Sequence, residues 1–153
     1  MSDLDRELVE KSIKMVRERF GRSGHSRFMG WYPEEIREDY SRLRVRLRED
    51  FLGEQGALHP GAVASFVDAA AGVAVAAGRT DMGPAWNATI NLLVNFLAAP
   101  TTDELIATAQ VRKRGKSVAT VAVSVEDTAG ELIATGTATF KMGVTFGVKE
   151  KKK

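Results

Sequence analysis

One carboxylate stands inside the most apolar stretch of this chain. Between Pro60 and Gly78 the residues are mostly Ala, Val and Gly, and the only polar side chains are Ser65 and Asp68. An unpaired charge in apolar surroundings is costly, so such a residue is usually retained at a working site. The carboxylate could act as a general base toward water or as a nucleophile toward a carbonyl carbon. The structural alternative is that Asp68 lies at a subunit interface or accepts hydrogen bonds from loop amides.

The segment that carries Asp68 has the boundaries of a helix. Pro60 suits the first turn, where its missing N–H is not needed, and Gly78 stands where helices commonly end. The stretch approaches the length of a membrane-spanning helix, but Asp68 near its middle would cost roughly 3 kcal/mol in lipid. A helix that is apolar on nearly all sides belongs in the interior of a fold. The sequence therefore predicts a buried helix and no membrane partner.

The segments around this helix indicate strands. Leu43, Val45 and Leu47 alternate with arginines, which is typical of a strand with one buried face. Gly115 and the turn at 127–130 separate the last strands, which are expected to form a meander. Four strand-like segments follow the helix, at 89–97, 105–112, 118–125 and 132–140. The predicted fold class is α+β, with a curled antiparallel sheet of five or six strands wrapped around a central apolar helix.

An amphipathic helix is predicted before the first of these strands. Residues 3–20 place Leu, Val and Ile side chains near one face and charges on the other. A glycine-containing connection at 21–30 and a short charged turn before residue 40 are expected to follow. The predicted organisation is an N-terminal helix and connection at 1–39 packed on the domain, the α+β domain itself at 40–146, and a charged tail at 147–153.

Composition excludes several classes of function. The chain has 153 residues, 44% of them hydrophobic and 27% charged, which is enough for one domain that buries about two-thirds of its surface. It contains no Cys, and its two His, His25 and His59, are too few for a His-rich metal site. The net charge of +2 and the absence of aromatics within the arginine stripe at 42–48 argue against nucleic-acid binding. The acidic N-terminus lacks the apolar core of a signal peptide, so we expect a cytoplasmic protein.

The residues around Asp68 resemble the signature of the PaaI-type hotdog thioesterases. That signature has a Gly, then His-Gly-Gly, then an apolar helix with an acidic residue nine places after the His. His59 and Asp68 keep this spacing, and Gly56 and Gly61 keep theirs. Further segments, at 89–97, 111–117 and 127–140, resemble the family's second strand, third turn and closing hairpin. The resemblance covers roughly residues 40–142.

This resemblance implies a hotdog-fold enzyme that hydrolyses an acyl-CoA or a similar thioester. Asp68 would be the nucleophile or general base, and the Thr89 hydroxyl would help to place the water. The start of the helix, through the Gly61 N–H, would bind the developing oxyanion. No metal is implied, and no cofactor beyond the coenzyme A of the substrate. The family forms its site between subunits, which implies a homodimer or homotetramer.

Two positions depart from the family's pattern. Gly53 stands where the family commonly has an Asn or Gln that orients the nucleophile or water, and the nearby Gln55 or Glu54 could substitute. Pro60 occupies the middle of His-Gly-Gly and has no N–H to donate to the thioester carbonyl, so Gly61 would have to take over. Loss of one oxyanion donor can slow catalysis about a hundred- to a thousandfold. Both departures favour the alternative of a non-catalytic acyl-CoA-binding module.

The remaining candidate residues each have a functional and a structural interpretation. His59 could contact the substrate carbonyl, or it could cap the start of the helix, which is the more common role for a single His there. Arg112, Arg114 and Lys116 form a basic turn that could bind the phosphates of coenzyme A. The alternative for that turn is a solvated hairpin tip. Hydration or dehydration of an acyl thioester is a third function, less favoured because such relatives place the acid at a different offset.

Overall fold

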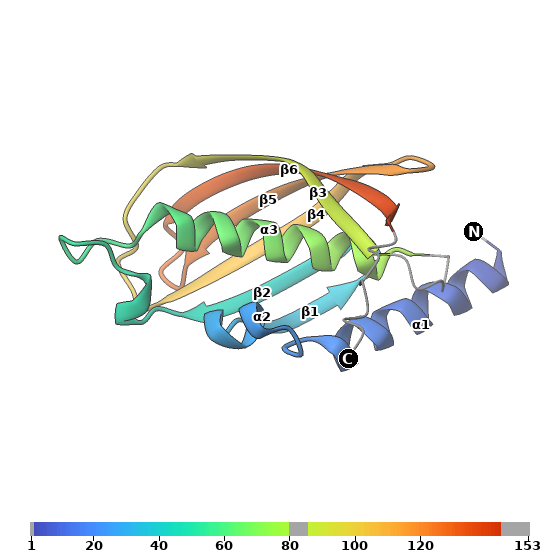
Figure 1. The fold of residues 1–153 in the computed structure, drawn as a ribbon, viewed down its shortest axis with the longest axis horizontal. Helices are drawn as coiled ribbons and strands as arrows, with labels where there is room; N and C mark the ends of the chain where they lie inside the picture. The colour runs from blue at the N-terminus through green and yellow to red at the C-terminus, as the bar shows by residue number, and fades with distance from the viewer. Residues whose placement is uncertain (1, 80–85, 145–153) are drawn as a thin grey trace, which may run out of the picture.

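Helix α3 (Pro60–Ala77) lies across the concave face of a curled sheet, as its composition predicted (Figure 1). The computed structural model describes residues 2–79 and 86–144. By length and composition alone α3 could cross a membrane, but eight of its residues are buried. A glycine of the sheet, Gly136, lets the sheet approach this helix closely, since a Cβ added to Gly136 would lie 2.5 Å from Cγ1 of Val67. The predicted central helix is confirmed.

Six antiparallel strands form the sheet, in the order β1-β2-β4-β5-β6-β3. Their bounds are β1 Tyr32–Arg37, β2 Tyr40–Arg46, β3 Trp86–Phe96, β4 Glu104–Arg114, β5 Val118–Asp127 and β6 Leu132–Val144. The last three strands pair in sequence order, which confirms the predicted meander. Because α3 connects β2 to β3 over the face of the sheet, β3 lies at the edge opposite β1. The α+β hotdog architecture implied by the sequence is therefore confirmed.

Strand β1 was missed by the sequence analysis, which predicted a charged turn there. It pairs with β2 through a short hairpin whose turn contains Asp39 in a left-handed conformation, φ 57°. Only Ile36 of β1 is buried, so no alternating apolar pattern marks the strand. A proline, Pro33, and several charged side chains are typical of an edge strand that faces solvent. Residues 32–37 thus belong to the sheet.

The N-terminal region forms two helices. Helix α1 (Asp3–Arg19) begins at a capping box, in which the Ser2 hydroxyl accepts from the Asp5 N–H and the Asp5 carboxylate accepts from the Ser2 N–H. Its buried Ser12 donates to the carbonyl of Ala76 near the end of α3 at 2.7 Å, and this bond fixes α1 against the domain. Helix α2 (Gly24–Met29) lies where a connection was predicted, because six residues give too short a periodic pattern to detect.

Two of the connections between these elements are ordered by local hydrogen bonds. A 3₁₀ turn, η1 (Glu49–Phe51), leads from β2 into the loop before α3. The turn after β5 is organised by Asp127, which is 2% exposed. Its carboxylate accepts from the Thr101 hydroxyl and N–H and from the amides of Glu131 and Ala129. These donors, the Thr101 hydroxyl above all, lower the pKa of Asp127 to about 2.

Candidate active site

The carboxylate of Asp68 accepts a hydrogen bond from the hydroxyl of Thr89. The distance from Thr89 Oγ1 to Asp68 Oδ1 is 2.7 Å. Asp68 is half-buried in the middle of α3, and none of the salt bridges among residues 2–79 and 86–144 involves it. The structure therefore brings together the two side chains that the sequence nominated as base and water ligand, with one carboxylate oxygen, Oδ2, left for another partner.

A bulge in β3 turns Thr89 toward α3. Thr89 lies opposite Phe140 of β6, but the next pair is Asn91 with Thr139, so Ile90 is an extra residue in β3. One inserted residue exchanges the two faces of a strand. Before the bulge Thr89 faces the space beside Asp68, whereas after it Val94 packs on the core. Bulges are common beside active sites for this reason.

Asp68 and Thr89 border a cavity of about 340 Å³. Its walls are mainly apolar and come from α1, the α2–β1 connection, α3 and β6: Met15, Val16, Phe20, Trp31, Val73 and Phe140. Trp31 is buried and stacks on Phe66, with ring centroids 6.0 Å apart. Cavities of a few hundred Å³ with a few polar groups are typical of small-molecule sites. Within the described part of the chain, no three His, Asp or Glu side chains gather as a metal site.

The first turn of α3 satisfies its own backbone donors. His59 is the N-cap, and its Nδ1 accepts from the Gly61 N–H at 2.9 Å. The Ala62 N–H donates to the His59 carbonyl at 3.0 Å, and Pro60 has no N–H. His59 thus has the capping role that its residue type favoured. The Gly61 N–H, nominated as the oxyanion donor, is engaged by that cap.

Gly61 and Asp68 do not meet within one protomer. They are seven residues apart on α3, and a rise of 1.5 Å per residue separates them by about 10 Å. An oxyanion donor must lie about 3 Å from the carbonyl oxygen whose carbon is attacked. A single thioester therefore cannot contact both groups of the same helix.

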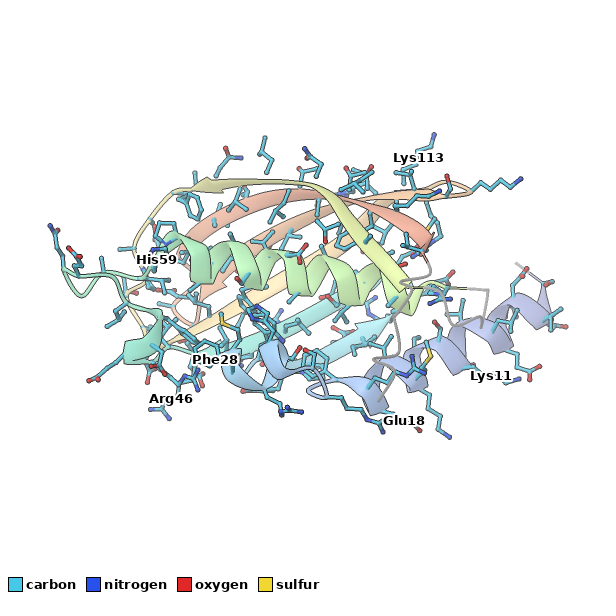
Figure 2. The ribbon with its side chains drawn as sticks, in the orientation of Figure 1. Lys11, Glu18, Phe28, Arg46, His59 and Lys113 are labelled. Carbon is cyan, nitrogen blue, oxygen red and sulfur yellow. The ribbon has the colours of Figure 1, made fainter. Side chains whose placement is uncertain are left out.

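The nominated substrate-binding residues lie at opposite ends of α3. Gln55 is exposed in the loop 52–58 that projects beyond the start of the helix (Figure 1). Figure 2 shows His59 at that end and Lys113, in the basic turn, toward the other. Within one protomer the structure does not bring Gln55 and the basic turn together, and Gln55 does not line the cavity beside Asp68.

The basic turn divides into exposed and engaged side chains. Arg112 and Lys116 are exposed. The Arg114 guanidinium, by contrast, donates through Nε to Asp39 Oδ1 at 2.9 Å, again to that oxygen through Nη2, and to the Val75 carbonyl at 2.8 Å. It therefore ties the end of α3 to the β1–β2 hairpin, and a ligand would have to compete with these bonds for it.

Most cavity residues were not nominated by the sequence analysis, and two of them, Arg79 and Asn87, are polar side chains with a bearing on the site. Arg79 is only 8% exposed and lines both the cavity beside Asp68 and a second hollow of about 380 Å³ that also includes Arg114 and Lys116. Asn87 lines the cavity two residues before Thr89. The sequence could have indicated Asn87, because Asn87 and Thr89 are both polar and stand two residues apart, a spacing that places both side chains on one face of a strand. Nothing in the local pattern marked Arg79.

Comparisons with known proteins agree with this architecture. A family model described as the acyl-CoA thioesterase N-terminal domain matches residues 48–141, more than half of the chain. A solved structure from the thioesterase superfamily is 29% identical, covers 86% of this chain and 98% of its own, and has a TM-score of 0.76. A thioesterase family protein from Silicibacter pomeroyi is 25% identical, with coverages of 88% and 99% and a TM-score of 0.78.

A further solved structure extends the likeness at lower identity. The E. coli PaaI protein from the phenylacetic acid degradation operon is 17% identical, covers 88% of this chain and 95% of its own, and has a TM-score of 0.78. At that identity the likeness concerns the fold. A search of the curated proteins gave no significant match.

Proposed function

Because this chain belongs to the acyl-CoA thioesterase family and is a PaaI-type hotdog protein, we propose that it hydrolyses an acyl-CoA or a similar acyl thioester with Asp68 as the reactive carboxylate. The observation that carries the proposal is the bond from Thr89 to Asp68 at the edge of an apolar cavity of about 340 Å³. The cavity would receive the acyl group, and coenzyme A would enter only as part of the substrate.

The Thr89 hydroxyl fixes the orientation of the carboxylate. By donating to Oδ1 it leaves Oδ2 of Asp68 to accept a proton from water. The water oxygen then attacks the thioester carbonyl carbon, the C–S bond breaks, and the thiolate leaves and takes up a proton. The products are a free acid and a thiol. Direct attack by Asp68 would instead form an anhydride, which water would hydrolyse in a second step.

A second copy of the chain would complete the site. Gly61 and Asp68 are about 10 Å apart on one helix, so we propose that the partner's helix start faces Asp68. Strand β3 offers the surface for such a partner, because it is an uncovered edge strand of eleven residues. Its side chains Ile90, Leu93 and Phe96 are apolar and more than half exposed. The exposed apolar edge supports a homodimer. A tetramer would consist of two such dimers.

The start of α3 also supports an alternative function. Pro60 has no N–H, and the Gly61 N–H donates to His59 Nδ1. Oxyanion binding therefore requires the His59 ring to turn away and release Gly61. If the cap stays closed, the same cavity would hold an acyl thioester without hydrolysing it, as a non-catalytic binding module.

The basic turn would bind the phosphates of coenzyme A. Arg112 and Lys116 are exposed and suited to this role, whereas Arg114 serves mainly to hold Asp39. Arg79 lines both the cavity beside Asp68 and the hollow beside Lys116. This continuity supports a substrate whose acyl end lies at Asp68 and whose phosphates lie at the β4–β5 turn.

The test is thiol release from a panel of short, long and aromatic acyl-CoAs by the wild type and the Asp68→Asn variant. We expect the variant to be at least a hundredfold slower on the best substrate. The matched control is Asp103→Asn, an exposed carboxylate paired with Arg46, which should retain full activity. Equal turnover by Asp68→Asn would remove the catalytic assignment. Melting shifts with acyl-CoA but without thiol release would support the binding module, and loss of enoyl-CoA absorbance would support a hydratase.

The partner proposal is tested separately by the Leu93→Lys variant. A lysine directed from the β3 edge should oppose strand pairing between copies. We expect light scattering to give the mass of a dimer or tetramer for the wild type and of a monomer for the variant, with thiol release lost in the variant. A monomeric and fully active wild type would refute the shared site.

A further inference from the structure

The side chain of Asn87 is a polar group that the proposed mechanism does not use. Its Oδ1 is buried and accepts no hydrogen bond, and none of the hydrogen bonds in the described chain involves this side chain. A buried acceptor without a partner is destabilising, and native structures retain few of them without a reason. Asn87 as a whole is half-buried and lines the cavity beside Asp68, so a turn of its amide about the soft χ2 torsion would bring Oδ1 to an incoming group.

Asn87 shares its strand face with Thr89. The two residues are separated by Ala88 and both precede the bulge at Ile90. The register shift just before Ala88 has its extra residue in β6, so the two side chains still point to the same side of β3. Both line the cavity, and Thr89 contacts Asp68 directly. An amide side chain and a carboxylate side chain therefore border the same cavity.

Among the described residues that line the cavity, no other side chain is an amide. Gly53 has no side chain to supply one, and Gln55 is exposed in the projecting loop, outside the cavity. A general base alone does not fix where the lone pair of a water molecule points, because the water can rotate about a single hydrogen bond. Two acceptors remove that freedom and align the water for attack.

We propose that Asn87 is a positioning residue for the hydrolytic water, an inference that rests on the proposed function. With the amide turned toward the cavity, the water would donate one hydrogen to Asn87 Oδ1 and the other to the Asp68 carboxylate, which satisfies the acceptor that is otherwise buried without a partner. Its oxygen lone pair then faces the carbonyl carbon of the thioester in the cavity. As the new C–O bond forms, the proton on the Asp68 side passes to the carboxylate, the C–S bond breaks, and the thiolate leaves.

The test compares Asn87→Leu, which has a similar size and no polar atoms, with Asn87→Gln, which keeps the amide on a longer stem. For Asn87→Leu we expect kcat to fall about 10- to 100-fold with KM changed less than about threefold, because water and not substrate loses its contact. The melting temperature should stay the same or rise, since an unpaired buried acceptor is removed. The kcat of Asn87→Gln should be at least fivefold higher than that of Asn87→Leu.

Several outcomes would overturn the assignment. Unchanged kcat in Asn87→Leu, with turnover that still depends on Asp68, would remove Asn87 and leave the proposed function intact. A loss of kcat accompanied by a lower melting temperature or by subunit dissociation would assign Asn87 to the fold or the interface. A rise in KM alone would make it an acyl contact. Absence of turnover in the wild type would remove both the inference and the hydrolase function.

Discussion

Gly72 is the position where two substitutions of different size test the proposed acyl cavity: alanine tests the room beside Phe140 through stability, and leucine tests acyl binding. It lies one turn after Asp68 on α3 and lines the cavity. A Cβ added there would lie 3.6 Å and 3.7 Å from ring atoms of Phe140, which is ordinary contact. Glycine inside a helix is less favourable than alanine by about 1 kcal/mol. Gly72→Ala should therefore raise the free energy of unfolding by about 0.5–1 kcal/mol, measured by urea denaturation, and the melting temperature by roughly 1–4 °C.

A larger side chain at Gly72 should close the cavity to large acyl groups. Leucine would occupy the space beside Phe140 that an acyl chain needs. Excluding two methylenes of the substrate from an apolar site forfeits about 1.6 kcal/mol, which corresponds to roughly tenfold in kcat/KM. We expect Gly72→Leu to lower kcat/KM for long and aromatic acyl-CoAs at least tenfold relative to acetyl-CoA, in the same thiol-release assay.

The reasoning about Gly72 has clear points of failure. A folded Gly72→Leu variant with an unchanged acyl preference would show that the acyl group binds elsewhere. Destabilisation by Gly72→Ala would show that the added methyl does not fit beside the Phe140 ring. Gly24→Ala is the matched control, because its added methyl meets open space outside the cavity and should leave acyl preference unchanged.

Two further predictions concern stability. The pKa of Asp127 is lowered from 3.8 to about 2 in the fold, so its stabilising contribution is complete above about pH 4 and declines as the pH falls toward 2. In urea denaturation, the free energy of unfolding of the wild type should exceed that of Asp127→Asn at pH 6, and the difference should be smaller at pH 3. A difference that does not change with pH would contradict this. Gly136→Ala places a Cβ 2.5 Å from Val67 Cγ1 and should destabilise the protein by about 1–3 kcal/mol. The loss should be smaller in a Val67→Ala background, and strict additivity of the two changes would refute the contact.

The main elements of the fold were predictable because their patterns are local. The apolar run from Pro60 marks α3 whatever surrounds it, and alternation around Leu43 marks β2. Strand β1 escaped detection for the converse reason: it is a short edge strand with one buried residue, Ile36, so its pairing with β2 leaves no periodic signal. Only the tertiary structure could show that this charged segment joins the sheet.

The candidate site divides in the same way. The sequence by itself determined that an acid lies in the middle of an apolar helix, nine residues after His59, because helix periodicity and composition act over a few turns. Only the tertiary structure decided that Thr89 reaches Asp68, since this depends on a single extra residue, Ile90, that exchanges the faces of β3. That contact depends on the pairing of β3 with β6, which are far apart in the sequence, and no local pattern of residues specifies it. The bond from the Gly61 N–H to His59 is local by contrast, and the residue type of His59 already favoured it.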